Sequence, residues 1–333
     1  MKILVLNYEF PPVGGGGGRI TEDICRGLAK RGHPIRVQTA YIKGLQKHQK
    51  KDGFEVYRSF SFRQRPESCS VLEMIAFIVL NIIPTLKHIR QWQPDIIHAH
   101  FALPTGMLAL IIHWITQIPY LLTVHLGDIP GGNPDLTDHY FNIVRPLTYP
   151  IWEQARLVTA VSEYSKQVAI KSYDVPIHVI PNGIDLDAVQ ISASCPNQTV
   201  RLVFAGRFDT VKNLPFFVGV LESIKDLDWV MTFLGDGPDM GVVKREIEAA
   251  GLSAKCQLPG WVDENTVSEV MQRADIFVLP SRYEGLSMAG LKAMAHGLAI
   301  LGSDVPGIAN VVQHGVNGYL CPIGDLDAFE NTL

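Results

Sequence analysis

Cysteine pairs and runs of like charge are both missing from this sequence of 333 residues. Its five cysteines (Cys25, Cys69, Cys195, Cys256 and Cys321) are odd in number, far apart and never in a C-x-x-C pair. This spacing argues against a disulfide framework or a zinc site and favours a reducing, cytoplasmic setting. Lys and Arg number 29 against 33 Asp and Glu, with no long run of either sign, so the charge pattern does not predict binding to nucleic acid.

The apolar runs are also shorter than the ~20 residues that a membrane span needs. The N-terminal "MKILVLNYEF" has too short an apolar run for a signal peptide and predicts a first buried strand. The most apolar later stretch, residues 71–86, contains Glu73 and Asn81, and Pro84 is expected to end it. We therefore expect a core helix there, with peripheral contact to a membrane surface as the minor alternative.

Short β-branched runs alternate with helix-length segments along both halves of the chain. Runs that are apolar on both faces and separated by helices predict a parallel sheet that is covered on both sides. After the first strand, Ile20, Ile24 and Leu28 share one helix face, and Gly32 supplies a stop. The expected strands are "KILVLN", "PIRVQTA", "FEVYRSF", "PDIIHAHF", "PYLLTVH", "RLVTAV" and "IHVIPN" in the first half, and "VRLVFAGRF", "WVMTFLGDG", "KCQLPGWV", "ADIFVLPS", "LAILGSDVPG" and "NGYLCP" in the second.

The length of the chain favours two domains of roughly 150 residues each. Residues 186–199 are mostly polar and small, which is typical of a linker. The expected fold class is therefore α/β, with two tandem Rossmann-like domains, residues 1–188 and residues 198–333, that face each other across a cleft. Open α/β sheets bind ligands at the carboxyl ends of their strands, so functional motifs should follow strands directly.

A run of five glycines, Gly14 to Gly18, follows the first strand and leads into a helix. Without Cβ atoms the backbone can approach a ligand closely, and the N–H groups of Gly15, Gly16 and Gly17 could meet an anion. A merely flexible loop is the alternative. A dinucleotide fingerprint fails because its third glycine position holds no glycine, so we set aside an NAD-dependent dehydrogenase.

Two cations, Arg207 and Lys212, come just after the first strand of the second half. Such a pair could hold a diphosphate, although solvated surface cations are common in loops. Further on, Glu284 precedes a helix whose N-terminus is expected at residues 285–288, where unpaired N–H groups form another phosphate site. Glu284 could accept hydrogen bonds from sugar hydroxyls, or it could only complement the helix dipole.

Candidate metal ligands are not grouped in the sequence. His98 and His100 end one strand and His125 ends another, with no nearby Cys or third ligand, and such histidines are as often structural as functional. Three acid pairs at D-x-D spacing lie in turn-like contexts, where a turn or a helix cap is their commoner use. We expect no metal site.

Nine segments, taken in their order, resemble glycosyltransferase family 4, a group of retaining enzymes with the GT-B fold. The resemblance implies a nucleotide-sugar donor held mainly by the second domain and an acceptor held mainly by the first. It also implies transfer with retention at the anomeric carbon and no required metal. The segments are "PPVGGGGGRITEDICRGLAKRGHPIRV", "PDIIHAHFALPTG", "TVHLGD", "VTAVSEYSK", "IPNGID", "AGRFDTVKNL", "FLGDGP", "ADIFVLPSRYEGLSMAGLKAMAHGLAILGSDVPG" and "HGVNGYL".

The resemblance also assigns roles to individual residues. Arg207 and Lys212 match the pair that neutralises the donor diphosphate, with help from the glycine loop. His125 matches the histidine that approaches the transferred sugar, and Glu284 matches a glutamate that contacts the hydroxyls of that sugar. The N–H groups at the helix start, which would meet the phosphates, belong to Gly285, Leu286 and Ser287.

The sequence departs from the family pattern at three places. Lys292 stands where the family has a glutamate that binds the nucleotide ribose, and we count it among the donor-binding positions. An ammonium group cannot accept hydrogen bonds from the ribose hydroxyls as a carboxylate does. Asn310 replaces another usual glutamate. The chain ends at Leu333, whereas the family normally continues through further helices, so we expect those helices to be missing.

Two functions follow from the residues and the resemblance. The first is a cytoplasmic hexosyltransferase that moves a sugar from a UDP, GDP or ADP donor to a hydroxyl of a glycan, lipid or small molecule. The second is a degenerate or partner-dependent protein that binds nucleotide sugars and has little activity of its own.

Overall fold

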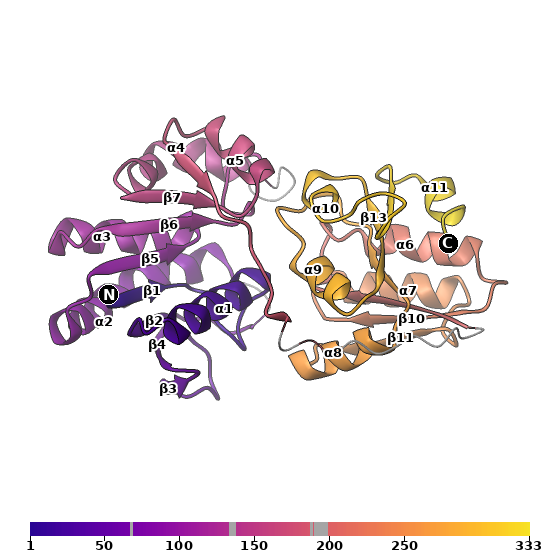
Figure 1. Ribbon diagram of the computed structural model, residues 1–333, viewed down its shortest axis with the longest axis horizontal. Coiled ribbons are helices and arrows are strands. Elements are labelled where there is room, and N and C mark those ends of the chain that lie inside the picture. The colour runs from indigo at the N-terminus through magenta and orange to yellow at the C-terminus, as the bar shows by residue number, and fades with distance from the viewer. Residues whose placement is uncertain (67–68, 133–137, 187–188, 190–198) are drawn as a thin grey trace. The chain divides into compact units, whose positions relative to one another are not determined.

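The computed structural model describes the chain except for residues 67–68, 133–137, 187–188 and 190–198. The structure divides into two compact units, Met1–Asn182 and Gly183–Leu333, which we call unit 1 and unit 2 (Figure 1). The expected linker, residues 186–199, lies for the most part outside the described residues. Each unit has its own sheet and its own hydrophobic cores.

Unit 1 is built on an eight-stranded sheet in the order β3-β4-β2-β1-β5-β6-β7-β8, and all its strands but β3 are parallel. All seven strands predicted for this half form. The sequence does not predict β3, because "HQKK" is polar and pairs antiparallel at the edge of the sheet. The strands are β1 (Ile3–Leu6), β2 (Ile35–Tyr41), β3 (His48–Lys51), β4 (Phe54–Phe60), β5 (Ile96–His100), β6 (Tyr120–Val124), β7 (Leu157–Ala160) and β8 (Ile177–Val179).

Helices cover both faces of this sheet, because each strand turns alternate apolar side chains to opposite faces. Ile3 and Val5 of β1 pack with Cys25 of the first helix, whereas Leu4 and Leu6 belong to the larger core on the opposite face. The helices of unit 1 are α1 (Gly16–Lys30), α2 (Val71–Trp92), α3 (Met107–Thr116), α4 (Asp138–Glu153) and α5 (Glu163–Ile170), with a π-helical turn, η1 (Ala102–Gly106), before α3.

The helix α2 is longer and more exposed than the sequence predicts. It continues to Trp92, so the expectation that Pro84 ends it is wrong. Pro84 has no N–H to donate to the Leu80 carbonyl oxygen, but Leu80 is 39% exposed and water can reach that position, while Ile89 holds the last turn in the core. By length and composition α2 could cross a membrane, and only a minor part of it is buried.

Unit 2 has a six-stranded, fully parallel sheet in the order β11-β10-β9-β12-β13-β14, and all six predicted strands form. One core joins Phe204, Phe217 and Phe329, and the core on the other face joins Phe277 and Met271. The strands are β9 (Val200–Ala205), β10 (Trp229–Leu234), β11 (Cys256–Gly260), β12 (Ile276–Leu279), β13 (Ala299–Ser303) and β14 (Gly318–Cys321). The helices are α6 (Leu214–Ser223), α7 (Met240–Ala249), α8 (Glu264–Arg273), α9 (Met288–Ala295), α10 (Pro306–Ala309) and α11 (Leu326–Glu330).

The cysteines that the structure describes form no disulfide bond. Cys25, Cys69, Cys256 and Cys321 are free, and Cys195 lies outside the described residues. Burial raises the pKa of the Cys25 thiol well above its usual range, which makes this thiol unreactive.

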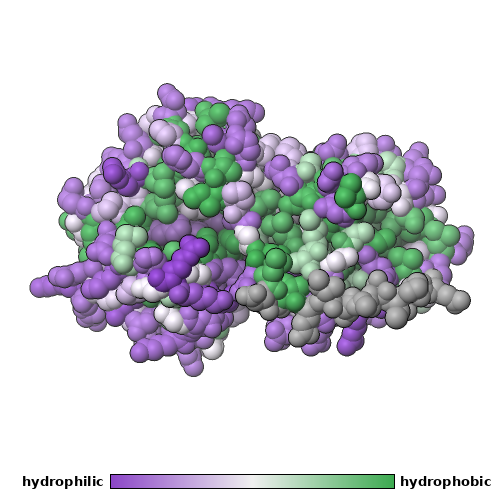
Figure 2. Space-filling model, in the orientation of Figure 1, coloured by the Kyte–Doolittle hydropathy of each residue, from purple (hydrophilic) through white to green (hydrophobic). Residues whose placement is uncertain are grey.

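On the face that Figure 2 displays, hydrophilic side chains predominate around α1 and β3.

Candidate active site

The glycine loop of unit 1 connects β1 to α1, and neighbouring segments hold it in place. Gly14 has a φ of +89°, in the left-handed region, and its N–H donates to the carbonyl oxygen of Pro66 (2.8 Å). The N–H of Gly15, the N-cap of α1, donates to Oε2 of Glu9 (3.2 Å), and Gly16 begins the helix. The loop is therefore fixed by hydrogen bonds rather than merely flexible.

The ring of Phe101 links the glycine loop to the predicted histidine. A Cβ atom on Gly17 would lie 2.3 Å from the tip of this ring, so the backbone of the loop approaches it as closely as glycine allows. The ring centroid of Phe101 lies 4.5 Å from that of His125 and 5.3 Å from that of Tyr8. Gly17 and His125, which are far apart in the sequence, thus contact the same side chain.

His125 follows β6 directly and is held by two neighbours. Its Nε2 lies 3.2 Å from Nδ1 of His100, and its backbone N–H donates to Oδ1 of Asp128 (2.8 Å). Burial, and to a lesser extent the neighbouring His98, lowers the pKa of His125 to about 3, and burial raises the pKa of Asp128 to about 6. His125 is therefore a neutral imidazole at neutral pH, which can exchange hydrogen bonds but cannot act as a cation.

Arg207 of unit 2 lies in the loop after β9, and the loop after β10 fixes its backbone. The N–H of Phe208 donates to the carbonyl oxygen of Asp236 (2.9 Å), and the N–H of Asp239 donates back to Phe208 (3.0 Å). Nε of Arg207 donates to Oδ2 of Asp209 (2.8 Å), with the arginine side chain 44% exposed. Sequence reasoning missed Asp209, since the pairing appears only once the loop has folded back on itself.

Lys212 and Glu284, which are 72 positions apart, form an ion pair. Nζ of Lys212 contacts Oε1 of Glu284, and the two side chains are only 21% and 13% exposed. The hydroxyl of Ser281 donates to the same oxygen (3.4 Å). The backbone of Glu284 packs against α10, where a Cβ atom on Gly307 would lie 2.0 Å from the Glu284 carbonyl oxygen. The structure therefore brings two of the predicted site residues together and fixes the carboxylate.

The helix that follows Glu284 begins later than the sequence predicts. α9 starts at Met288, and its N-cap is Ser287, whose Oγ accepts the N–H of Gly290 (3.2 Å). Gly285 and Leu286 belong to the preceding loop rather than to the first turn. The cap itself uses one of the unpaired N–H groups at the helix start, which leaves fewer for an anion than the sequence alone predicts.

Lys292, one turn into α9, is paired with a carboxylate from another helix. Its Nζ contacts Oε1 of Glu264, the first residue of α8, and the side chains are 18% and 49% exposed. α8 follows β11 and α9 follows β12, so the pair links the first residue of α8 to the second half of α9. Sequence reasoning missed Glu264. The cation at position 292 thus comes with a carboxylate beside it.

Two of the remaining polar candidates, His98 and Asp325, have structural partners, and Asp187 lies outside the described residues. Nε2 of His98 lies 2.8 Å from Oγ1 of Thr123, and Asp325 is the N-cap of α11, accepting the N–H of Ala328 (3.0 Å). Among the described residues, no three His, Cys, Asp or Glu side chains are grouped so that they could hold a metal ion.

Two family models match nearly the whole chain. The model described as Glycosyltransferase Family 4 matches residues 14–188, and the model described as Glycosyl transferases group 1 matches residues 199–333. The chain is 27% identical to N-acetyl-alpha-D-glucosaminyl L-malate synthase of Bacillus anthracis, over 98% of this chain and 85% of that protein. It is 26% identical to a UDP-Gal:alpha-D-GlcNAc-diphosphoundecaprenol alpha-1,3-galactosyltransferase of Escherichia coli, over 76% of this chain and 69% of that protein.

Solved structures agree on the fold. HepE of Anabaena, solved in complex with UDP and glucose, superposes with a TM-score of 0.77 at 19% identity, covering 99% of this chain and 88% of that chain. A sucrose-phosphate synthase of Thermosynechococcus elongatus superposes with a TM-score of 0.83 at 17% identity, covering 100% of this chain and 88% of that chain. With its two Rossmann-like units, this chain belongs to glycosyltransferase family 4, has the GT-B fold and is a glycosyltransferase.

Proposed function

We propose that this glycosyltransferase moves a hexose from a nucleotide-diphosphate sugar to a hydroxyl acceptor, with retention at the anomeric carbon. The observation that carries the proposal is the pair of ionic contacts after β9 and β12, Arg207 with Asp209 and Lys212 with Glu284. A diphosphate attracts both cations more strongly than a single carboxylate does, because it offers more charge and more acceptor oxygens. Glu284, released from Lys212, would then accept hydrogen bonds from the sugar hydroxyls.

The transfer step follows from this placement of charge. The bond between the anomeric carbon and the β-phosphate oxygen breaks, and negative charge develops on the departing diphosphate. Arg207 and Lys212 stabilise that charge, which lowers the barrier because the interaction strengthens in the transition state. The acceptor oxygen bonds to the anomeric carbon on the face that the phosphate leaves, and its proton passes to a phosphate oxygen. No protein nucleophile and no metal ion take part in this proposal.

The roles of the unit 1 residues stay predictions. Gly15, Gly16 and Gly17 would offer backbone to a ligand, which can approach most closely at Gly15, since Phe101 fills the space beside Gly17. His125, as a neutral imidazole, would exchange a hydrogen bond with the transferred sugar. The acceptor is a glycan, lipid or small molecule: the name of the E. coli relative contains a diphosphoundecaprenol-linked sugar, and the name of the B. anthracis relative contains L-malate. We propose a cytoplasmic protein with peripheral membrane contact.

Lys292 is the observation that favours the second candidate, a nucleotide-sugar-binding protein with little activity. It places a cation where related enzymes have a carboxylate, and Asn310 at the end of α10 is a second departure. Under this candidate the chain binds a nucleotide sugar without turning it over. The pairing with Glu264 weighs against it, since the structure retains a carboxylate within contact of position 292.

A donor panel tests the proposal. UDP-, GDP- and ADP-hexoses are incubated with the wild-type protein, and released nucleotide is measured together with calorimetric titration of UDP, GDP and ADP. We expect turnover of one donor, lowered about 100-fold to 1000-fold in kcat by Lys212→Met. The matched control is Lys244→Met, which removes an exposed lysine of α7 and should change kcat less than twofold, about the scatter of the assay.

Three outcomes contradict the proposal in different ways. Nucleotide binding without turnover of any donor supports the second candidate. Turnover that survives Lys212→Met and Glu284→Gln unchanged shows that the site lies elsewhere. A product with the inverted anomeric configuration, read by proton NMR, rejects retention while leaving the donor site intact.

A further inference from the structure

The helix α2 buries two polar side chains beside Phe77 and Ile89, and most of its outward side is apolar. Asn81 and Thr85 are fully buried, and Oδ1 of Asn81 accepts a hydrogen bond from Nε2 of Gln38 (2.7 Å). The apolar residues of the opposite side remain exposed, up to 78% for Leu72 and 77% for Ile83. A helix of a soluble domain normally keeps its outward side polar, so it is the outward side of α2 that is inverted. The outward apolar side of α2 therefore needs an explanation of its own.

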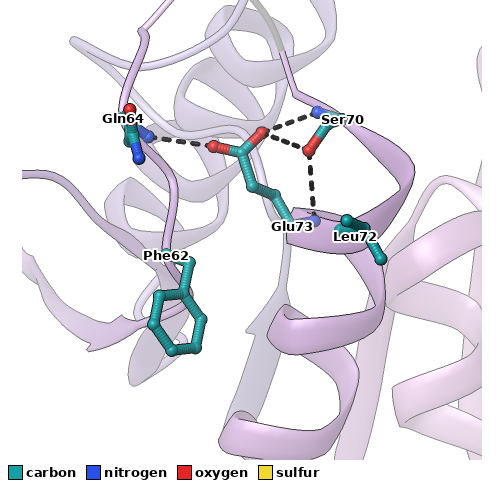
Figure 3. A pocket seen from close by; sticks show the side chains of 5 residues that line it. All are labelled: Phe62, Gln64, Ser70, Leu72 and Glu73. Carbon is teal, nitrogen blue, oxygen red and sulfur yellow. Dashed lines mark hydrogen bonds between the residues drawn. The ribbon is translucent and has the colours of Figure 1, made fainter.

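The segment that leads into α2 has the same inversion. Ser61 and Arg63 are buried, whereas Phe60 and Phe62 are 55% and 59% exposed and pack edge to face, with ring centroids 4.6 Å apart. Phe62 has a φ of +59°, a strained conformation for a bulky residue. Figure 3 shows its ring beside a pocket that is also lined by Leu72 at the start of the helix. Strain is thus tolerated at a side chain that adds nothing to the core.

Eight exposed side chains form this surface, which we call the α2 face. Leu72, Ile75, Val79 and Ile83 follow one another at three- and four-residue spacing, so they share one side of the helix. The full α2 face consists of Phe60, Phe62, Val71, Leu72, Ile75, Val79, Leu80 and Ile83.

The exposed charged side chains that the structure describes between residues 60 and 92 are all basic. The only acidic side chain described between residues 60 and 92 is Glu73. Oε2 of Glu73 accepts hydrogen bonds from the N–H (2.7 Å) and the hydroxyl of Ser70, and its Oε1 accepts one from the N–H of Gln64 (Figure 3). The basic side chains of Arg65, Lys87 and Arg90 are exposed. Lys87 continues the spacing of Ile83, so the apolar side of the helix ends in a cation. This pattern complements a surface that is apolar within and anionic at its edge.

A lipid bilayer with anionic headgroups matches that description better than a second copy of the chain does. Two α2 faces brought together would place basic groups at the interface without acidic partners, because Glu73 is committed to its cap. The helix cannot leave the fold to span a bilayer, since Phe77 and Ile89 anchor it in the core. It can lie in the interface plane along its length of about 33 Å.

We propose that the α2 face is a membrane-binding surface that inserts at the headgroup–acyl boundary of an anionic bilayer. This rests on the peripheral contact proposed above and names the surface that makes it. The same segment is tied to the glycine loop, because the guanidinium of Arg63 donates to the carbonyl oxygens of Tyr8 (3.0 Å) and Pro66 (3.1 Å), and Pro66 also accepts from Gly14. Docking would therefore hold the glycine loop close to the membrane surface, where a lipid-linked acceptor lies.

Vesicle cosedimentation tests the proposal without any donor or acceptor. We expect the wild-type protein to bind vesicles that contain phosphatidylglycerol much more than vesicles of phosphatidylcholine alone. Leu72→Glu combined with Ile83→Glu should weaken binding at least about tenfold by removing inserted apolar area. Lys87→Gln combined with Arg90→Gln keeps the apolar face and should weaken binding about fivefold per charge, with loss of the preference for anionic lipid.

The controls separate the surface from general effects. Val316→Glu combined with Ile323→Glu adds the same charges at exposed apolar positions of unit 2 and should bind vesicles as the wild type does. Melting curves confirm that each variant is folded. Failure of the wild type to bind anionic vesicles overturns the proposal, as does equal loss in the unit 2 control. A wild-type dimer that Leu72→Glu dissociates overturns it in favour of an interface between copies. Because the assay needs no turnover, these results do not depend on whether the proposed transfer activity is found.

Discussion

Reversing the ion pair between Lys292 and Glu264 gives a direct test of the site in unit 2. The lysine side chain is 18% exposed and the glutamate 49%, so water screens the attraction and the pair contributes about 1 kcal/mol at most. Lys292→Glu removes that attraction and places two carboxylates side by side, which adds a repulsion of similar size. We expect unit 2 to lose about 2 kcal/mol of unfolding free energy and about 4–8 °C of melting temperature.

A second substitution should restore the loss. In the double variant Glu264→Lys, Lys292→Glu, the same two charges face each other in exchanged positions. We expect its melting temperature to lie close to that of the wild type, measured by scanning calorimetry on all four proteins of the cycle. A double variant whose loss equals the sum of the two single losses would refute the contact, because the coupling between the positions would then be zero.

The same four proteins test what the exchange means for the nucleotide. The double variant has the carboxylate on α9, as related enzymes do, whereas the wild type has it on α8. We expect equal affinity for UDP, GDP or ADP by calorimetric titration, since either arrangement offers a carboxylate to a ribose hydroxyl. If the double variant binds about tenfold more tightly, the wild type lacks a working contact, and the second candidate function gains support.

Three further changes have outcomes that the structure predicts. Burial lowers the pKa of His98 and His88 to about 4 and that of His125 to about 3, so below pH 6.5 the unfolded chain binds more protons than the folded one. The unfolding free energy should therefore fall by about 2 kcal/mol per histidine between pH 7 and pH 5, partly offset by Asp128, whose pKa is raised. A melting temperature that does not fall over this range would contradict the prediction. Incubation with EDTA should leave donor turnover unchanged, and loss of turnover that added Mg²⁺ or Mn²⁺ restores would show that a metal takes part. Gly17→Ala should lower turnover at least about tenfold, because the added Cβ atom displaces the Phe101 ring that packs against His125. Gly27→Ala on the same helix, where a Cβ atom meets nothing within 4 Å, should leave turnover unchanged. Equal activity of the two variants would contradict the contact between Gly17 and Phe101.

The sequence predicts the sheets of this protein well because all their strands except β3 are parallel and most are buried. Every predicted strand forms, from Ile3–Leu6 to Gly318–Cys321. The missed strand, His48–Lys51, carries no apolar signal, since its position at the sheet edge asks only for backbone hydrogen bonds. The predicted helix end at Pro84 is wrong because packing of the last turns of α2 outweighs one lost backbone hydrogen bond. No local sequence pattern indicates that packing.

The predicted site residues come from strand ends and from the family resemblance, but their partners do not. Asp209 and Glu264 stand in segments whose local pattern indicates only a turn and a helix start. Asp209 becomes a partner of Arg207 when the loop after β9 folds back on itself, and Glu264 becomes a partner of Lys292 when α8 and α9 come together. The two cations can be predicted from the sequence because they stand in motifs that follow strands. The carboxylates that pair with them in the absence of a ligand can be recognised only in the tertiary structure.

The ion pair of Glu284 with Lys212 suggests how sugar and diphosphate recognition are linked under the proposed function. Glu284 cannot offer Oε1 fully to a sugar hydroxyl while Lys212 and Ser281 contact it. A diphosphate that takes Lys212 would release the carboxylate at the moment when the attached sugar arrives beside it. A free sugar brings no charge to displace the lysine, so it should bind weakly by comparison. Recognition of the hexose would then depend on the diphosphate that carries it, which favours the intact donor over its hydrolysis products.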